Sequence, residues 1–531
     1  MTAVSILALC ACGQDNKVPE VAEATPEQVT RVEPPCWWAG MKTDLQLLVL
    51  GPAISDYDVR IFGDAEVTGV HKAESPNYLF VDVKVGAPGQ IWVVFVKDGQ
   101  YAFKVPYQIG ERREGSAERK SFSTADLIYL IMPDRFANGD PTNDNTPDTD
   151  DKADREKLTG RHGGDIKGIM DHLDYIADLG ATAIWNTPLL EDNEPRESYH
   201  GYACSDYYRI DPRFGDNEMY CELVRRCHER GIKMIMDIVT NHCGDAHWWM
   251  KDLPFADWVH QWPEYTHSNC NFAMQNDPNS ATIDQINMQS GWFDTSMPDM
   301  NLDNPYLLQY FKQWAVWWIE YADLDGLRVD TYPYNEKVPM SQWCAAVRKE
   351  YPNINIVGEV WTNNIAQLAY WQDGAMNRDG FNSNLPSIMD FPLHSAFCQG
   401  PNLSPPHDAE CFFEGFATNC RILLQWIFLR TVFSTYLQKH RLFQFRQNQS
   451  ATFCRKVLFQ LSVHQPSCTP FHPDCDNPDS VSGSPVDPDQ SDTLYDLPAP
   501  TQSPDSHRWL FYPPRLFGSP QKSLCPFSAP L

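Results

Sequence analysis

Residues 232–242 read IKMIMDIVTNH, an apolar run that ends in polar and ionisable side chains. A short apolar run of this kind is typical of a strand buried on both faces, as in a parallel sheet. Three other runs end similarly: Trp185 is followed by Asn186-Thr187, Val329 by Asp330, and Val357 by Gly358-Glu359. A single acid at such a place is often a salt-bridged loop residue. Four polar strand ends together indicate a functional site.

Stretches with helical spacing separate these apolar runs. They cover residues 169–179, 220–230, 306–321 and 342–350, and an earlier β-rich run lies at Leu127–Met132. Alternating strands and helices predict an α/β fold with a parallel sheet covered by helices. Five or six such units over about 280 residues favour a (β/α)₈ TIM-type barrel, which carries its chemistry at the carboxyl ends of the strands.

This alternation stops before a complete barrel is reached. Ser387–Leu393 is predicted as the sixth strand, and the pattern ends near Gln399. We therefore expect a partial catalytic barrel over residues 120–399, incomplete after its sixth strand. Residues 400–531 form an atypical Pro- and Ser-rich tail, which is expected to be disordered or translated out of frame.

Short apolar runs separated by turns precede the barrel. They recur about every ten residues from Leu45 to Tyr107 without helical periodicity, and Asp98-Gly99 is a hairpin signal. This spacing predicts an amino-terminal β-sandwich over residues 25–115. The cluster Pro34–Trp38 is interpreted either as a face that stacks on sugars or as the buried start of a strand, and the second is the more common case.

Composition excludes several classes of protein. The 531 residues carry 70 acids and 42 Lys plus Arg, a net charge of −28, which disfavours a nucleic-acid partner. No uninterrupted apolar run is long enough for a membrane-spanning helix. The 16 cysteines include no C-x-x-C pair, so a zinc site or a thioredoxin-like motif is not indicated.

The amino terminus carries a short apolar run, Val4–Ala11, followed by Cys12. It resembles the end of a bacterial lipoprotein signal, with residues 1–24 as signal and tether and Cys12 as the lipidated residue. The alternative is an ordinary frayed terminus. The first interpretation predicts a protein of the cell envelope, periplasmic or at the outer membrane, that meets the membrane only through a lipid anchor.

The order of the motifs along the chain is specific. Taken together they resemble glycoside hydrolase family 13, the α-amylase family, and within it the neopullulanase and cyclomaltodextrinase group. The motifs that carry this resemblance are Asp237–His242, Gly326–Asp330, Gly358-Glu359, Met297–Asn301, Tyr199–Tyr202 and Asp206-Tyr207, with Val32–Met41 in the first domain. The resemblance implies a retaining hydrolase of maltodextrins, cyclomaltodextrins or pullulan, with transglycosylation as a close variant.

The residue types fit this chemistry. Retaining hydrolysis uses two carboxyl groups about 5–5.5 Å apart, and neighbouring strands lie about 4.8 Å apart. Asp330 is predicted as the nucleophile and Glu359 as the acid/base. Arg328 lies two residues before Asp330, so both side chains point to the same side, and the cation should orient that carboxylate and lower its pKa. Burial and the charge of Asp330 should raise the pKa of Glu359.

The resemblance also implies residues that contact the sugar. His200 and His242 would donate to hydroxyl groups and Tyr202 would stack under a ring. Asp237, Asn241 and Trp361 complete the predicted substrate-binding set. A packed structural role is equally common for a histidine of this kind. A homodimer is expected by analogy alone.

An oxygen-rich loop follows the first predicted barrel strand. The matching group binds calcium with this segment, and calcium takes six to eight oxygen ligands. The alternative is a solvated polar loop with Asx-turns. The ligands that the resemblance implies are Asn138, Asp140, Asn143, Asp144, the carbonyl of Gly163, and Asp165.

Two features depart from the family pattern. Tyr334 lies where many members carry His. The family also uses a third carboxylate on its seventh strand, preceded by His. Asp408 in Pro406-His407-Asp408 is a poor match because Pro-rich sequence precedes it in place of a strand. A catalytically impaired carbohydrate-binding lipoprotein is therefore the rival hypothesis.

Overall fold

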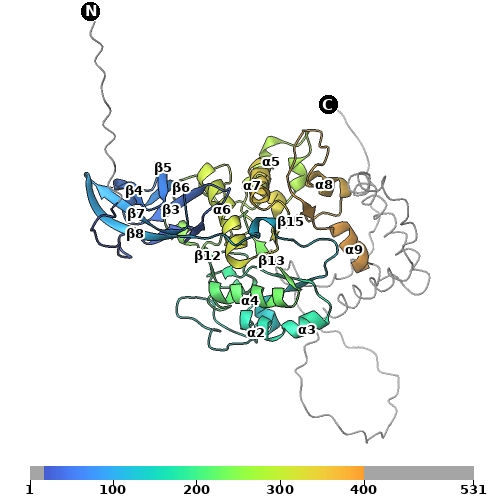
Figure 1. The fold of residues 1–531 in the computed structure, drawn as a ribbon. Coiled ribbons are helices and arrows are strands. Elements are labelled where there is room, and N and C mark those ends of the chain that lie inside the picture. Colours follow the sequence, from blue (N-terminus) through green and yellow to red (C-terminus); the bar gives the residue numbers. More distant parts are fainter. Residues whose placement is uncertain (1–16, 400–531) are drawn as a thin grey trace, which may run out of the picture. The chain divides into compact units, whose positions relative to one another are not determined.

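The computed structural model describes residues 17–399 (Figure 1). Cys12, Asp408 and the tail of residues 400–531 lie outside the described residues. Lipidation, the third acid and the nature of the tail therefore stay predictions. Within residues 17–399, no helix combines the length and apolar character that crossing a bilayer requires.

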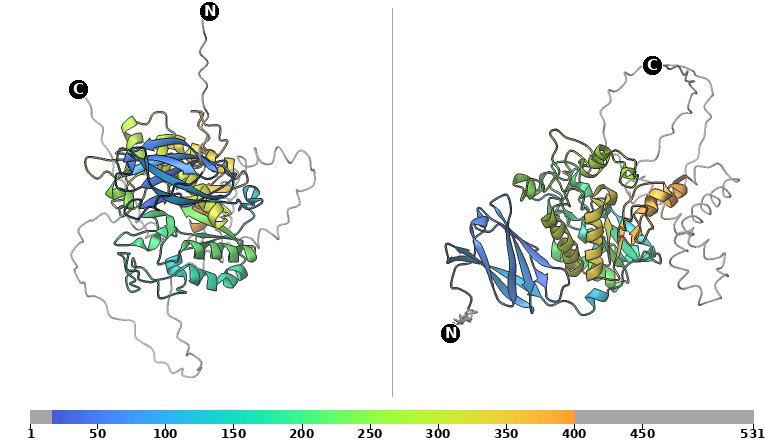
Figure 2. Two further views of the ribbon diagram at one scale, coloured as in Figure 1. Left: turned by 60° about the vertical axis from the view of Figure 1, so that its left-hand side comes forward. Right: turned by 90° about the horizontal axis from the view of Figure 1, so that it is seen from above.

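Two four-stranded sheets form the first part of the chain, drawn in blue in Figure 2. One has the order β1-β3-β6-β5 and the other β2-β8-β7-β4, and all pairs except β2–β8 are antiparallel. The region predicted as a β-sandwich therefore consists of largely antiparallel sheets. The strands are β1 (Arg31–Glu33), β2 (Trp37–Trp38), β3 (Leu45–Leu50), β4 (Asp58–Phe62), β5 (Ala65–Lys72), β6 (Tyr78–Val85), β7 (Gly89–Lys97) and β8 (Gln100–Gly110).

Local sequence explains two features of these sheets. Asp98 and Gly99 join β7 to β8 with φ values of 51° and 76°, the positive values that a type I′ hairpin requires. Trp37 is 1% exposed, and the neighbouring Trp38 contacts Trp317 with ring centroids 6.4 Å apart. Trp37 is therefore buried at the start of a strand, which is the second of the two interpretations.

The second part is built on a six-stranded parallel sheet of order β9-β10-β13-β14-β15-β16, with helices outside it (Figure 1). The predicted parallel sheet is confirmed. Any strands that would close the barrel lie outside residues 17–399. The strands are β9 (Ile128–Ile131), β10 (Ala183–Asn186), β13 (Lys233–Ile238), β14 (Gly326–Val329), β15 (Asn355–Gly358) and β16 (Ser387–Ile388). A separate antiparallel pair joins β11 (Leu190–Glu191) to β12 (Asp206–Ile210).

Helices follow most of these strands. They include α1 (Pro133–Phe136), α2 (Ile166–Asp171), α3 (Leu173–Asp178), α4 (Asn217–Glu229), α5 (Thr282–Ser290), α6 (Pro305–Ala322), α7 (Lys337–Glu350), α8 (Ile365–Tyr370) and α9 (Phe391–Gln399). The predicted strand Ser387–Leu393 is too long: it ends at Ile388. Asp390 Oδ1 accepts a hydrogen bond from Leu393 N at 3.0 Å, an N-cap that starts α9 in place of the strand.

Two buried acids join the sandwich to α6 and α7. Glu350, at the end of α7, accepts from the backbone N–H groups of Lys42 at 2.7 Å and Thr43 at 2.8 Å, and from Arg112 at 2.6 Å. Glu320 on α6 accepts from Arg112 at 3.3 Å. Ser116 Oγ and Tyr351 Oη also donate to Glu320, and Arg119 Nη2 forms an ion pair with Glu320 Oε2 at 3.6 Å. We call Glu320 and Glu350 with these partners the interface cluster; it lies before the amino ends of β14 and β15.

Candidate active site

The sheet register places the polar strand ends side by side. Ile238, Val329 and Gly358, the last residues of β13, β14 and β15, are paired across the sheet. Asp330 N donates to the carbonyl of Ile238 at 2.9 Å, and Glu359 N donates to that of Val329 at 2.9 Å. The two predicted catalytic acids therefore leave adjacent strands at the same edge.

One buried guanidinium binds three carboxyl groups at this edge. Arg328 Nη1 lies 2.7 Å from Asp330 Oδ1 and 2.8 Å from Asp237 Oδ1, and Arg328 Nη2 lies 2.9 Å from Glu359 Oε1. Asp330 and Glu359 are also hydrogen-bonded to each other. We call Asp237, Asp330 and Glu359 the carboxyl trio. The sequence predicted the contact of Arg328 with Asp330 but not its contacts with the other two.

Burial governs the pKa values of the trio. It raises the pKa of Glu359 to about 7, as predicted, with Asp330 adding to the rise and Arg328 opposing it. It raises the pKa of Asp237 to about 6. It also raises the pKa of Asp330, against the lowering expected from Arg328. That expectation was wrong because burial outweighs the pull of a cation that Asp330 shares with two other acids.

Two aromatic side chains hold Asp237. Trp185 Nε1, at the end of β10, donates to Asp237 Oδ2 at 2.8 Å, and Tyr202 Oη donates to the same oxygen at 3.2 Å. The guanidinium of Arg328 lies over both rings, 5.0 Å and 5.9 Å from their centroids. Tyr202 was predicted as a sugar contact, whereas Trp185 was noted only as a strand end. Trp185 could have been predicted as a partner of Asp237, because their strands, β10 and β13, are neighbours in the sheet.

The two predicted histidines have different surroundings. His242 is buried and stacks on Phe293 with centroids 5.2 Å apart, and burial lowers its pKa to about 4, so it is neutral at neutral pH. His200 is 21% exposed at its side chain, and its Nδ1 accepts from Tyr202 N at 2.9 Å. In neutral His200 the proton is therefore on Nε2, which can donate to a sugar hydroxyl.

Asn241 links the site to the motif Met297–Asn301. Its Nδ2 donates to Asp299 Oδ1 at 2.8 Å, and Asp299 Oδ2 lies 2.7 Å from His260 Nδ1. His242 Nδ1 lies 3.1 Å from Asn241 Oδ1. Asn241 therefore orients His242. Within residues 17–399, its side chain forms no hydrogen bond with the carboxyl trio.

Aromatic side chains lie outward from the trio. Trp361 follows Glu359 by two residues, is 44% exposed and stacks on Phe391 with centroids 4.9 Å apart. Tyr334, the residue that departs from the family pattern, packs edge-on against Phe293. Burial raises the pKa of Tyr334, and Cys270 and the charges of Glu359 and Asp330 add to the rise. An exposed ring beside the acids can stack on a sugar.

The oxygen-rich loop fits a calcium ion in part. Asn138 Oδ1 and Asn143 Oδ1 are buried without a hydrogen-bond partner among the described residues. Asn138 Nδ2 donates to Asp144 Oδ1 at 2.6 Å, and a Cβ on Gly163 would lie 2.5 Å from that same oxygen. Orphaned amide oxygens beside a carboxylate and a backbone segment match the donor set that calcium prefers.

The other two predicted ligands shape the loop. Asp165 Oδ1 caps α2 by accepting from Gly168 N at 2.6 Å, and its Oδ2 accepts from Asp140 N at 2.8 Å. Asp140 Oδ1 accepts from both the N–H and the hydroxyl of Thr142. Both oxygens of Asp165 and one oxygen of Asp140 are therefore already engaged by the protein itself.

Comparison with known protein families gives two matches. The model described as Alpha amylase, catalytic domain, matches residues 130–397, just over half of the 531 residues. The chain belongs to the α-amylase family. The model described as Cyclomaltodextrinase, N-terminal, matches residues 31–113, which hold β1 to β8.

Individual relatives agree with this membership. A cyclomaltodextrinase from Thermoanaerobacter pseudethanolicus is 33% identical over 305 residues, covering 55% of this chain and 47% of the relative. Neopullulanase 2 from Thermoactinomyces vulgaris is 35% identical over 245 residues, covering 44% and 38%. A solved α-amylase from Anoxybacillus is 30% identical, covers 54% of this chain and 55% of that one, and has a TM-score of 0.43. The chain spans less than half the length of both curated relatives.

Proposed function

We propose that this member of the α-amylase family is a retaining hydrolase of maltodextrins, cyclomaltodextrins or pullulan. The carboxyl trio on Arg328 carries the proposal, because two of its acids leave adjacent strands and share one cation. The names of the relatives, cyclomaltodextrinase and neopullulanase, support this substrate class.

Each acid has a defined task in the proposed reaction. Asp330 attacks the anomeric carbon, forming an ester bond as the bond to the leaving oxygen breaks, and Glu359 gives its proton to that oxygen. Glu359 then takes a proton from water, whose oxygen displaces Asp330 from the sugar. The raised pKa of Glu359, about 7, keeps it protonated for the first step near neutral pH. Arg328 holds Asp330 in place for the attack.

The remaining predicted residues would bind the glucan. His200 Nε2 would donate to a sugar hydroxyl, neutral His242 would do the same, and Tyr202 would lie beneath a ring. Trp361 offers the exposed face for a neighbouring sugar. A glucan entering this site would displace the direct hydrogen bond between Asp330 and Glu359, since the scissile bond has to lie between the two carboxyl groups.

Hydrolysis of two defined substrates tests the proposal. The full chain should release reducing sugar from maltoheptaose and β-cyclodextrin, and Asp330→Asn should abolish this. Asp171→Asn, which changes an exposed acid paired with Lys167, is the matched control and should keep full activity. Binding of maltoheptaose without hydrolysis would instead favour the carbohydrate-binding protein, and unchanged activity in Asp330→Asn would refute the assignment of the nucleophile.

We also propose that the loop formed by Asn138, Asn143, Asp144 and Gly163 holds a structural calcium ion. The two orphaned amide oxygens support it. Calcium that binds only the folded state should stabilise it and so raise the melting temperature. At a calcium concentration 100 times the dissociation constant, the free energy of unfolding should rise by about 2.7 kcal/mol. The measurement is thermal unfolding in CaCl₂ and in EGTA for the native protein, for Asp144→Ala and for the control Asp171→Asn. Equal melting temperatures with and without calcium would contradict the site.

A further inference from the structure

Two of the predicted sugar-binding residues lie on one tight turn. The 3₁₀ helix η3 (Ser198–His200) begins after Glu197, with φ 63°, and ends at Gly201, with φ 79°. A Cβ on Gly201 would lie 2.2 Å from the carbonyl oxygen of Pro188, so the backbone runs against its neighbour there. We call residues 198–202 the Ser198 turn. Glu197 is a non-glycine residue in the left-handed region, which makes the start of the turn costly, so contacts from elsewhere have to hold it.

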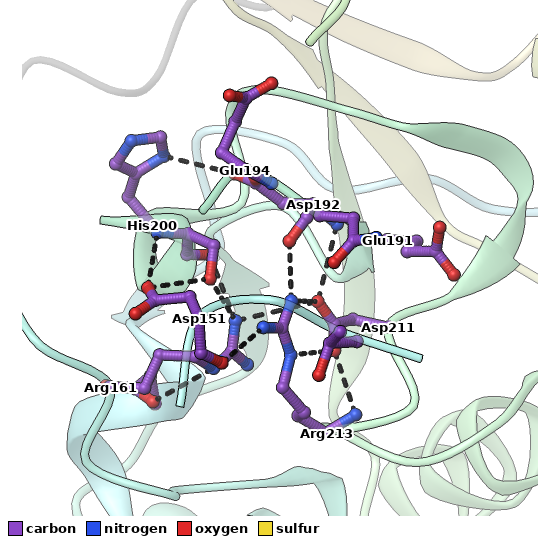
Figure 3. A network of polar contacts seen from close by, with 12 residues as sticks. Asp151, Arg161, Glu191, Asp192, Glu194, His200, Asp211 and Arg213 are labelled. Carbon is purple, nitrogen blue, oxygen red and sulfur yellow. Dashed lines mark hydrogen bonds and ion pairs between the residues drawn. The ribbon is translucent and has the colours of Figure 1, made fainter. Parts of the chain in front are cut away.

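A buried arginine binds the start of this turn (Figure 3). Arg161 is 1% exposed, and its Nη1 donates to the carbonyl oxygen of Ser198 at 3.1 Å and to Ser198 Oγ at 3.2 Å. Asp151 Oδ2 accepts from the N–H and from the hydroxyl of Ser198, both at 3.1 Å. The backbone of Ser198 is thus bound through its N–H by an acid and through its carbonyl by a cation.

The arginine is itself held rigidly. Its Nη1 lies 3.6 Å from Asp211 Oδ2 and its Nε lies 3.9 Å from Asp134 Oδ1, and the guanidinium stacks over Phe214 at 4.7 Å. Asp211 is in turn bound by Arg213 at 2.7 Å. Among the residues described, the hydrogen bonds of the Arg161 guanidinium go to Ser198. Burying a guanidinium costs desolvation free energy. A buried arginine whose hydrogen bonds go to one residue of a turn therefore indicates that the position of this turn matters.

The turn carries this constraint to the carboxyl trio. His200 Nδ1 accepts from Tyr202 N, which fixes the two residues relative to each other, and Asp192 Oδ2 lies 3.7 Å from the same nitrogen. Tyr202 Oη then donates to Asp237. A shift of Ser198 would therefore move both the His200 ring and the Tyr202 ring.

We propose that Arg161 is a positioning residue that, through Ser198, sets where His200 and Tyr202 meet the glucan. The identity of the ligand, a glucan, rests on the proposed function, whereas the contact of Arg161 with Ser198 does not. Arg161 has no part in the chemistry, so its removal should weaken substrate binding more than it slows the chemical step. If Arg161 had only a structural role, replacing it would lower stability and leave the substrate affinity of the folded molecules unchanged.

Limited proteolysis tests the geometric half of the proposal without any substrate. Arg196 is exposed and lies two residues before Ser198, so tryptic cleavage after it reports opening of the turn. Arg161→Lys and Ser198→Ala should speed this cleavage several-fold. The matched control is Arg119→Lys, a buried arginine that likewise binds backbone carbonyls, those of Ile319 and Leu324, in the interface cluster. Cleavage at the native rate in both test variants would overturn the proposal.

Kinetics with maltoheptaose tests the other half. Ser198→Ala removes only a hydroxyl and is the variant that folds most safely, while Arg161→Lys keeps the charge but not the two-fold contact. KM should rise about tenfold in Arg161→Lys and less in Ser198→Ala, with kcat changed less than threefold. Arg119→Lys should leave KM unchanged.

The outcomes separate the two proposals. If the native chain hydrolyses maltoheptaose and KM is unchanged in Arg161→Lys, the positioning role is wrong and the proposed function stands. If the native chain neither binds nor hydrolyses maltoheptaose, the proposed function fails. Cleavage after Arg196 then still decides whether Arg161 holds the turn.

Discussion

The carboxyl trio and the interface cluster are both groups of buried acids around arginine, yet they are satisfied very differently. In the interface cluster, Glu350 alone accepts from two backbone N–H groups, a threonine hydroxyl and Arg112. In the trio, three carboxyl groups share the guanidinium of Arg328. Glu350 has four donors, two of them backbone N–H groups, whereas the three acids of the trio depend on a single cation.

This difference shows what buried acids can be used for. An acid with donors on several elements, such as Glu350, joins two parts of a fold. Burial raises the pKa of acids that share one cation, to about 7 for Glu359 and to about 6 for Asp237, and an acid with a raised pKa can keep a proton for transfer. The trio is therefore suited to proton transfer at the expense of stability, whereas the interface cluster stabilises the fold.

The largest expected effect is on activity, from substitution within the trio. Asp330→Asn should lower kcat/KM on maltoheptaose by more than about 10⁴-fold, the scale seen when a nucleophile is removed. Glu359→Gln should lower it by about 10² to 10⁴-fold, the usual share of a general acid. Steady-state kinetics measures both.

The same variants should not lose stability. A carboxyl group whose pKa is raised by burial opposes folding at neutral pH, so the neutral isostere should melt at the same temperature or higher. A large fall in melting temperature for both variants would show that the trio is a structural cluster like the interface cluster, which would break the contrast.

The second effect is on stability, from the interface cluster. Glu350→Gln leaves Arg112 short of a partner and turns an NH₂ group toward one of the donors to Glu350. It should cost about 3–5 kcal/mol, seen as a lower melting temperature in calorimetry. The kcat of the folded protein should stay at the native value, and a specific loss of kcat would place this cluster in the chemistry.

The smallest effect is on pH dependence. The pKa of Glu359 is raised from its ordinary 4.5 to about 7, so kcat/KM should fall as pH rises through about 7. Stability has the same sign: the contribution of this group is complete below about 4.5 and is lost as pH rises through about 7, on the order of 3 kcal/mol in all. Melting temperatures from pH 4 to 8 measure it, and Glu359→Gln should flatten that curve. A native curve as flat as that of the variant would contradict the raised pKa.

Much of the fold could be predicted from the sequence. Continuous apolar runs between helical stretches indicate strands in a parallel sheet, and the runs at β10, β13, β14 and β15 were placed correctly. The run at Ser387–Leu393 was not, because the N-cap of Asp390 outweighs its apolar character. The hairpin at Asp98-Gly99 was predicted because its backbone conformation needs those residue types.

The site was predicted less completely. The spacing of Arg328 and Asp330 shows that both side chains point the same way, but it does not show how far a guanidinium reaches across strands. Because Arg328 also contacts Asp237 and Glu359, it does not lower the pKa of Asp330 enough to offset burial, and neither fact could be predicted from the spacing. Trp185 and Arg161 were missed because their roles depend on hydrogen bonds to residues far along the chain, Asp237 and Ser198.

The central claim is that Asp330 attacks the sugar, and trapping the covalent intermediate tests it most directly. The full chain is incubated with 5-fluoro-α-D-glucosyl fluoride, digested with trypsin and examined by mass spectrometry. The account predicts a fluoroglucosyl adduct on the peptide of residues 329–337, assigned to Asp330 by fragmentation and absent from Asp330→Asn. An adduct on any other residue, or inactivation of Asp330→Asn at the native rate, would contradict it.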